Sequence, residues 1–454
     1  MTSSAPRMRL NPMLRRAALA AMVLCLLLPG PPVKAYSVLS HEALIDAAWD
    51  PFIVPLLLRR YPGATPDQLL EAHAYAYGGC VIQDLGFYPF GNHYFSDLTH
   101  YVRTGDFIEA LLADSRDINE YAFALGSLSH YVADNTGHPL AVNISVAEMY
   151  PDLRQKFGNT VTYADNPTAH IMTEFSFDVV QITGAGYLPM TYHNFVGFKV
   201  PRALLNRAFQ DTYGLKLDGL FWSERLSIWS YKLTASEVIP DIGQILWRKK
   251  GQHLRRADPQ IVTARFRHQL SAQNYRSPAR RRRRYYRLSP WAWQWESRAK
   301  EANVQFVARV LVLFVEVSPK VGPLRTLTFK PPTVKVQDQF IKAFDVTVSR
   351  FGSDLVELRK GSDLALPEEN LDTGRAIKAG GYSLADKTYA HLLHDLTRRH
   401  FRGLTPGLQK DILSYYEVPE VSTTATTHPK KWEKIQRELT ALRAAPVQSQ
   451  IASH

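Results

Sequence analysis

Cysteine is scarce in this chain. Of the 454 residues only Cys25 and Cys80 are cysteines, and Cys25 lies in an N-terminal segment that we expect to be removed. The remaining chain then has one cysteine, which excludes an internal disulfide. For an exported protein, this absence means that rigidity must come from packing or from bound metal.

Long apolar runs are missing after Tyr36. The most apolar later stretch, Phe306–Val317, spans only about 12 residues and carries Arg309 and Glu316, so it predicts a buried helix and not a membrane span. We therefore expect no transmembrane segment in the mature chain.

The first 35 residues have the features of a secretory signal peptide. Four arginines precede an apolar run of about 13 residues from Ala17 to Pro29, and small or short residues stand at positions −3 and −1 of a cleavage site before Tyr36. Cleavage there removes five Lys/Arg and no acidic residue, so the formal charge falls from +12 to +7. The sequence predicts a secreted or periplasmic protein, with an uncleaved membrane anchor as the alternative.

Alternating strand-like patterns are also few. Leu327–Gln337 is a short strand candidate, but the pair Pro331-Pro332 weakens it. Apolar residues instead recur at spacings of three and four along most of the chain, which predicts an all-α protein. The expected helices are 41–60, 66–77, 106–112, 120–133, 167–183, 202–213, 223–249, 297–317, 334–350, 383–399, 407–416 and 430–443.

Composition divides the chain into five expected segments. They are the signal peptide (1–35), a main helical domain (36–249), a basic linker or insertion (250–296), a C-terminal helical region packing on the main domain (297–421) and a charged tail (422–454). The linker holds five consecutive arginines, Arg280–Arg284, which predict an exposed loop. Such a run could also attract the phosphates of nucleic acid or an anionic membrane.

The stretch GSLSHYVADNTGHPL places His130, Asp134 and His138 at intervals of four residues. On a helix, residues four apart share a face, so His130 and Asp134 can bind one metal ion. Gly137 and Pro139 suggest that the helix ends there, which would turn His138 toward a second ion.

Three other stretches carry ligand-type residues. NPTAHIMTEF pairs His170 with Glu174 at the same spacing, behind a predicted helix cap at Asn166. A stretch broken by glycine and proline contains Asp84, His93 and His100. YSVLSH would place a free Tyr36 amine and its carbonyl five residues before His41, and both groups can bind zinc.

Two further patterns have ordinary explanations. His391, His394, Asp395 and His400 lie in HLLHDLTRRH, where the leucines indicate an amphipathic surface helix and a separate metal site is the alternative. The alternating tryptophans of WAWQW (291–295) indicate packing, with insertion at a membrane interface as the alternative.

A single His-x3-Asp pair on a helix is common and predicts little alone. Here five histidines and three carboxylates occur in order within about 140 residues, a combination that indicates a site for several zinc ions. They are His41, Asp84, His100, His130, Asp134, His138, His170 and Glu174.

This ordered set resembles the zinc-dependent phospholipase C family over roughly residues 36–249. The resemblance implies a mainly helical fold with a cleft that holds three zinc ions. It implies one zinc on Asp84, His100, His130 and Asp134, and a second on Asp134, His41 and the Tyr36 amine and carbonyl. The third zinc would lie on His138, His170 and Glu174.

Parts of the sequence also look like related groups. The fungal zinc nucleases share this fold, and the stretches around Asp84 and His130 look like the catalytic domain of glycosylphosphatidylinositol-specific phospholipase D. Two positions depart from the pattern. The first residue is Tyr36 where the bacterial phospholipases and the nucleases usually have tryptophan, and His93 competes with His100 as the loop ligand because it matches the clostridial toxins.

The expected activity is hydrolysis of a phosphodiester by zinc-activated water, with Asp84 as the general base. We expect a phospholipid substrate and a protein that binds membrane surfaces peripherally. A nuclease acting on single-stranded nucleic acid is the alternative, and a non-catalytic zinc protein that binds lipid or polyanions is a third hypothesis. The headgroup and the oligomeric state stay open.

Overall fold

The computed structural model describes residues 38–183, 197–257, 330–417 and 429–447. Within these ranges the protein is all-α, as predicted, and the strands are one antiparallel pair, Glu369–Asn370 (β1) and Arg375–Ala376 (β2). Tyr36, the expected signal peptide, the arginine run, the tryptophan triplet and Phe306–Val317 lie outside the described residues.

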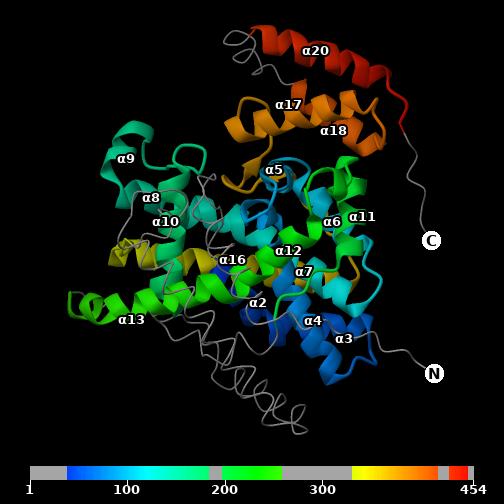
Figure 1. The fold of residues 1–454 in the computed structure, drawn as a ribbon. Helices are drawn as coiled ribbons and strands as arrows, with labels where there is room; N and C mark the ends of the chain where they lie inside the picture. Colours follow the sequence, from blue (N-terminus) through cyan, green and yellow to red (C-terminus); the bar gives the residue numbers. More distant parts are fainter. Residues whose placement is uncertain (1–37, 184–196, 258–329, 418–428, 448–454) are drawn as a thin grey trace, which may run out of the picture.

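The first part of the chain folds into a series of helices joined by short turns (Figure 1). These are α2 (Val38–Ala48), η1 (Trp49–Ile53), α3 (Val54–Arg60), α4 (Pro66–Gly79), η2 (Ile82–Phe87), α5 (His93–Tyr101), α6 (Thr104–Ala113), α7 (Ile118–Gly137), η3 (His138–Val142), α8 (Asn143–Met149), α9 (Pro151–Phe157), α10 (Pro167–Phe177) and η4 (Asp178–Thr183). After residue 196 follow α11 (Arg202–Tyr213), η5 (Leu217–Gly219), α12 (Glu224–Leu233), η6 (Thr234–Val238) and α13 (Ile239–Ala257).

Several helices begin where the sequence supplies a cap. Thr65 forms a capping box with Gln68 at the start of α4, and the Asp117 carboxylate accepts the amides of Asn119 and Glu120 at the start of α7. Asn166 caps α10 as predicted, because its side-chain oxygen accepts the Ala169 amide at 2.9 Å. Two of these caps fix the starts of α7 and α10, which carry candidate ligands.

Helices α4 and α7 pack unusually close together. A Cβ at Gly126 would lie 2.1 Å from the Ala76 carbonyl oxygen, and one at Gly79 would lie 2.1 Å from the Phe123 oxygen. Only glycine permits this approach of two backbones. The contact brings the C-terminal end of α4 and η2 against the middle of α7, where the histidine stripe begins.

The long helix α16 (Val334–Lys360) runs through the same core (Figure 1). Its Phe340, Phe344 and Phe351 are buried, and α16 packs against α7 and α2. The weak strand candidate at 327–337 is wrong from Thr333 on, where the Thr333 hydroxyl accepts the Val336 amide and caps α16, the helix expected over 334–350. The apolar alternation of the stretch is the first turn of a helix that extends beyond its predicted end at 350.

The last helices form a separate layer at one end of the molecule (Figure 1). They are α17 (Ser383–Arg398), α18 (Pro406–Tyr416) and α20 (Pro429–Ala444). Helix α17 packs on α5 on one side and on α20 on the other. The rings of Tyr389 and Tyr415 stack with centroids 3.6 Å apart and join α17 to α18.

Candidate metal centre

Three groups of buried histidines and carboxylates lie on α2, η2, α5, α7, η3 and α10. In each group the ligand atoms lie within 4.8 Å of one another, close enough to hold one metal ion. The groups are His41, His130 and Asp134; Asp84, His100 and His130; and His138, His170 and Glu174. Eight of the nine residues predicted as metal ligands are therefore brought together, and the ninth, Tyr36, precedes the described residues.

Asp134 lies at the middle of these groups. Its Oδ2 is 3.1 Å from His130 Nε2 and 3.5 Å from His100 Nε2. Its Oδ1 is 3.4 Å from His41 Nε2 and 3.7 Å from His138 Nε2. Because its two oxygens face different sets of imidazoles, Asp134 has the geometry of a carboxylate that bridges two ions.

Backbone carbonyls orient two of the histidines. His130 Nδ1 lies 3.0 Å from the Cys80 carbonyl oxygen, and His100 Nδ1 lies 2.7 Å from the Ser96 carbonyl oxygen. A carbonyl only accepts, so Nδ1 carries a proton in each ring, and in the neutral imidazole the Nε2 lone pair points toward the cluster. This arrangement of a ring nitrogen donating outward is typical of metal-binding histidines.

Asp84 is buried without an ordinary partner. Its side chain is 1 % exposed, and neither carboxylate oxygen accepts a hydrogen bond from the residues that the structure describes. Its nearest charged neighbour is His100, whose Nε2 lies 3.4 Å from Oδ1. A buried carboxylate left in this state is costly unless a cation neutralises it, so the site fits a metal ion.

The third group depends on a local change in helix geometry. The α-helix α7 ends at Gly137, as expected, but the chain stays helical and continues through the π-helical turn η3 into α8. Such a turn changes the direction of side chains without ending the helix. His138 Nε2 thereby lies 3.3 Å from Glu174 Oε1, beside His170, whose Nε2 is 3.1 Å from the same oxygen.

Glu174 resembles Asp84 in its surroundings. It is 1 % exposed, and among the described residues neither of its oxygens accepts a hydrogen bond. Both nitrogens of His170 are also buried without a hydrogen-bond partner in this part of the chain. Imidazole nitrogens and carboxylate oxygens are zinc ligands, so this donor set also fits zinc.

The electrostatics of the cluster favour bound cations. Burial alone would raise the pKa of Asp134, but His130 and His138 hold it well below its usual range. Burial would lower the pKa of His100, but the Asp134 and Asp84 carboxylates, 3.5 Å and 3.4 Å from its Nε2, raise it to about 9. His41, by contrast, has a lowered pKa because it is fully buried and lies beside His130. Asp134 therefore stays charged and attracts positive charge into the cluster.

The structure also places the competing histidine. His93 lies at the start of α5 with its ring edge-to-face against Phe87, the centroids 5.1 Å apart. His100, one helix length later, is 2 % exposed and lies within the cluster. The geometry therefore favours His100 over His93 as the ligand, and it places His100 on the helix α5 and not in the expected loop.

Asp178 is a site residue that the sequence analysis missed. Its two oxygens accept the amides of Leu39 at 2.9 Å and Ser40 at 3.1 Å, and its Oδ1 also accepts the Ser40 hydroxyl. Asp178 thereby ties the start of α2, and with it His41, to the end of α10. A signal was present, because Asp178 continues the four-residue spacing of His170 and Glu174.

Asp372 is the second missed residue, and no ligand spacing pointed to it. It lies in the turn between β1 and β2, and its Oδ1 is 3.6 Å from His138 Nδ1. Its carboxylate also accepts the Tyr101 hydroxyl at 2.7 Å and that of Tyr382. A segment more than 200 residues downstream of His138 therefore closes one side of the third group.

The histidines of α17 are used differently. The ring of His391 stacks on Tyr94 with centroids 3.8 Å apart, and His394 Nδ1 lies 2.7 Å from Glu438 Oε1 on α20. His400 follows the helix and is exposed. These contacts join α17 to α5 and α20.

Comparison with known proteins gives one match. The family model described as zinc-dependent phospholipase C matches residues 40–221, which contain His41 and every later residue of the three groups. Neither the curated proteins nor the solved structures include a match to the chain. Among the described helices, none is long and apolar enough to cross a bilayer. Over residues 40–221 the chain is therefore similar to the zinc-dependent phospholipase C family, which agrees with the resemblance seen in its sequence.

Proposed function

We propose that this protein is an exported zinc-dependent phosphodiesterase that hydrolyses the phosphodiester of phospholipids. One observation carries the proposal. The family-matched segment buries three groups of histidine and carboxylate atoms, each within 4.8 Å, and the Asp84 and Glu174 oxygens accept no hydrogen bond from the described residues. That arrangement is costly for an empty core and suited to several cations.

The proposed ligands follow the geometry. Asp84, His100 and His130 would hold one zinc ion with Asp134 Oδ2. Asp134 Oδ1 would reach a second ion together with His41 and the amine and carbonyl of Tyr36, if cleavage exposes that residue.

The third ion would lie on the remaining group. His138, His170 and Glu174 converge there, with Nε2 of both rings near Glu174 Oε1. Three protein ligands leave room for a substrate oxygen or water in a tetrahedral site. This is the arrangement expected of a catalytic ion, not a structural one.

Bound zinc would supply positive charge that stabilises phosphoryl oxygens and makes a nearby water more acidic. Asp84 is the proposed general base: one of its oxygens lies near His100 Nε2, and the other would take the proton of the attacking water. Attack at phosphorus breaks the bond to the diacylglycerol oxygen, which takes up a proton as it leaves. His100 and His130, fixed by backbone carbonyls, hold their ring orientation throughout.

A direct assay separates lipid from nucleic acid as substrate. Zinc-loaded protein should release choline phosphate from lecithin and little acid-soluble nucleotide from single-stranded DNA. The opposite pattern would make the protein a nuclease. Turnover of neither substrate, nor of other phosphoesters, by a protein that holds zinc would support a non-catalytic zinc protein instead.

A further inference from the structure

Asp372 lies in a tightly held turn beside the third group. Its side chain is 2 % exposed, although it lies well outside the segment that the family model matches. Its Oδ1 faces His138 Nδ1 at 3.6 Å, while Nε2 of the same ring faces Glu174. One imidazole therefore lies between a candidate metal group and a carboxylate from the C-terminal part of the chain.

The backbone of the turn fixes the position of this carboxylate. The Asp372 carbonyl oxygen accepts the side-chain amide of Asn143 at 2.8 Å, and the Leu371 amide donates to the His100 carbonyl oxygen at 3.1 Å. Gly374 has a φ of +61°, and a Cβ there would lie 2.3 Å from the Asn135 carbonyl oxygen. Only glycine allows the turn to approach α7 this closely.

Two tyrosines fix the side chain. The hydroxyls of Tyr101 and Tyr382 both donate to Asp372 Oδ2, and the Tyr382 oxygen also accepts the Ala164 amide at 3.0 Å. Burial and the charge of Asp372 raise the pKa of both tyrosines well above the ordinary value, so they remain donors. Oδ1 is thereby directed at the histidine.

We propose that Asp372 is a positioning residue that orients His138 for zinc binding. It accepts the proton of His138 Nδ1 and leaves the Nε2 lone pair directed at the third ion. A carboxylate behind a ligating imidazole fixes its tautomer and makes it a stronger ligand. This inference rests on the proposed function only because it takes zinc as the bound ion. It goes beyond the proposed function because it adds to the site a residue from the C-terminal part of the chain.

The test is the affinity of the third zinc. In a chelator competition, Asp372→Asn should lower the affinity for one zinc ion by roughly 10- to 100-fold and leave the affinities for the other ions unchanged. Glu368→Gln is the matched control, because Glu368 lies in the same segment and its oxygens accept the Gly105 and Asp106 amides at 3.1 Å each, without contacting His138. It should lower the melting temperature and keep every zinc ion at wild-type affinity.

Two outcomes would overturn the inference. The first is that Asp372→Asn binds every zinc ion with wild-type affinity. The second is that Asp372→Asn and Glu368→Gln lose the same zinc affinity and the same stability. Asp372→Glu, which retains the charge, should recover part of the affinity. Because the readout is zinc binding, failure of the proposed lipid activity would appear separately, in the lecithin assay of the same wild-type protein.

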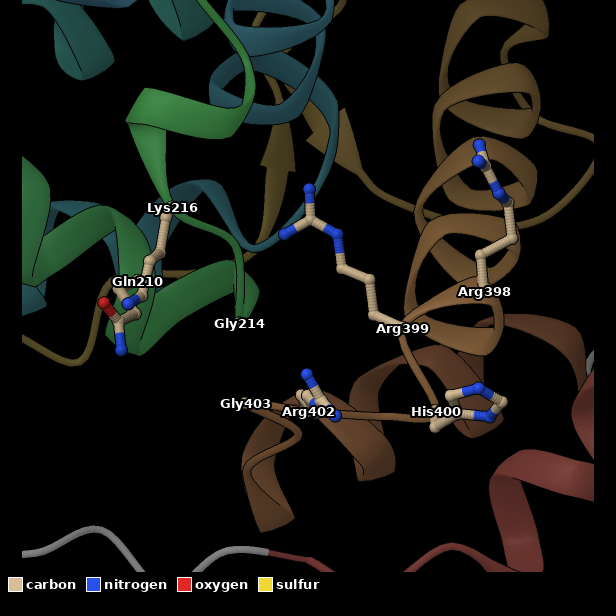
Figure 2. Close-up of a pocket in the computed structure, with 8 residues that line it drawn as sticks. All are labelled: Gln210, Gly214, Lys216, Arg398, Arg399, His400, Arg402 and Gly403. Atoms are coloured by element: carbon tan, nitrogen blue, oxygen red, sulfur yellow. The ribbon is translucent and has the colours of Figure 1, made fainter.

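A second, independent feature is a basic pocket away from the three metal groups (Figure 2). It has a volume of about 650 Å³ and lies between the end of α11 and the end of α17. Its lining residues are Gln210, Gly214, Lys216, Arg398, Arg399, His400, Arg402 and Gly403. None of these eight is acidic, and four carry a permanent positive charge.

These charges are not neutralised by neighbours. Within the described ranges, no carboxylate forms an ion pair with Lys216, Arg399 or Arg402, and Figure 2 shows the Arg399 guanidinium lying between the two walls. Arginines at a helix end often offset the helix dipole, which accounts for Arg398 and Arg399. It does not account for Lys216 and Arg402, which lie outside α11 and α17.

The backbone holds the two walls together. Gly214 and Gly403 both have positive φ, and a Cβ on Gly403 would lie 2.6 Å from the Gly214 carbonyl oxygen. Between α17 and Gly403, His400 and Phe401 also adopt left-handed conformations, with φ of 53° and 56°. Such unfavourable backbone persists where packing or function requires it.

We infer that this pocket binds a phosphate group. Arginine guanidinium groups match phosphate oxygens in pairs, and a cluster of unpaired cations has no better ligand than a polyvalent oxyanion. The phosphate could be free in solution or part of an anionic lipid headgroup at a membrane. The inference does not depend on the reaction at the metal centre.

Calorimetric titration of zinc-loaded protein with inorganic phosphate tests it. The wild type should bind phosphate, and the double variant Arg399→Gln/Arg402→Gln should bind it with an affinity lower by roughly tenfold or more. The control Lys387→Gln/Lys410→Gln removes the same charge from exposed positions of α17 and α18 outside the pocket, and should bind as the wild type does. Equal phosphate binding by both double variants would overturn the inference.

Vesicles distinguish the source of the phosphate. The vesicles would be made of a non-hydrolysable phosphonate analogue of phosphatidylcholine, with or without added phosphatidic acid. If the ligand is a lipid headgroup, phosphatidic acid should increase sedimentation of the wild type and the control but not of Arg399→Gln/Arg402→Gln. If it is a soluble phosphate, the three proteins should sediment alike while their phosphate affinities still differ.

Discussion

Helices α7 and α17 carry similar residues at the same spacing but use them in different ways. His130 and Asp134 on α7 are 0 % and 1 % exposed and meet side chains from α2, η2 and α5. His391 and Asp395 on α17 have the same spacing, yet the His391 side chain is 52 % exposed. The His391 ring stacks on Tyr94, so it serves packing between helices.

The difference shows what makes a metal site. A stripe of ligands on one helix supplies at most two donors to one ion, and the others must come from other elements. On α7 the close α4 contact brings Asp84 and the Cys80 carbonyl to the stripe. On α17 the neighbouring helices offer a tyrosine ring and Glu438 instead.

Replacing the central carboxylate on each helix should give the largest difference. Asp134→Asn should remove zinc and lower turnover by roughly 10³-fold or more, because Asp134 faces four imidazoles across the candidate ions. Asp395→Asn should retain wild-type turnover and zinc content. Zinc analysis and lecithin hydrolysis on both variants measure the effect; similar losses in the two would break the comparison.

The next largest effect concerns the expected N-terminal ligand Tyr36, because the α17 stripe has no comparable ligand. An extra residue retained before Tyr36 should lower turnover at least about tenfold, since it moves the chain end away from His41. Tyr36→Phe is the control, because it leaves the amine and carbonyl unchanged. Both proteins are compared after sequencing of their N-termini. Full activity of the extended chain would remove Tyr36 from the ligand set.

Asp178→Asn should have a moderate effect, on stability more than on chemistry. An amide cannot accept the Leu39 and Ser40 amides with both of its polar atoms, so the free energy of unfolding should fall by about 1–3 kcal/mol. Asp152→Asn, at an exposed position of α9, should leave it unchanged. Denaturant unfolding of the two variants measures this, and equal stabilities would mean that Asp178 does not anchor α2.

The smallest effect is a pH dependence in the C-terminal layer. Burial raises the pKa of Asp411 to about 6, while the Tyr389 hydroxyl donates to it at 3.1 Å. Because the folded-state pKa lies above the ordinary value, Asp411 costs stability progressively as pH rises from about 4 through 6.

Asp411→Asn should remove this cost. Its stability relative to the wild type should increase by about 1 kcal/mol between pH 5 and pH 7.5. Thermal unfolding of both proteins at the two pH values measures the change. A difference that does not vary with pH would show that Asp411 titrates normally.

Sequence patterns predicted much of the fold and of the candidate site because both depend on local spacing. Apolar periodicity gave the helices, and the cap at Asn166 marked the start of α10. Histidine and carboxylate spacing gave the side chains that the structure brings together.

The remaining features depend on tertiary contacts. Gly137 and Pro139 mark the end of α7, but nothing local in the sequence indicates that the chain continues from there into a π-helical turn at His138. Asp372 reaches His138 through a turn held by Asn143 and Tyr382, and spacing along the chain carries no such information. The α17 stripe could be separated from the α7 stripe only by knowing what packs against each.

Zinc content of the exported, zinc-saturated protein tests the central claim most directly. Mass spectrometry of the intact holoprotein should find about three zinc ions per chain, the capacity of the three buried groups. Lecithin hydrolysis should be lost when a chelator removes them and should return when zinc is restored. A chain that binds no zinc, or that turns over lecithin fully after its metal is removed, would contradict the account.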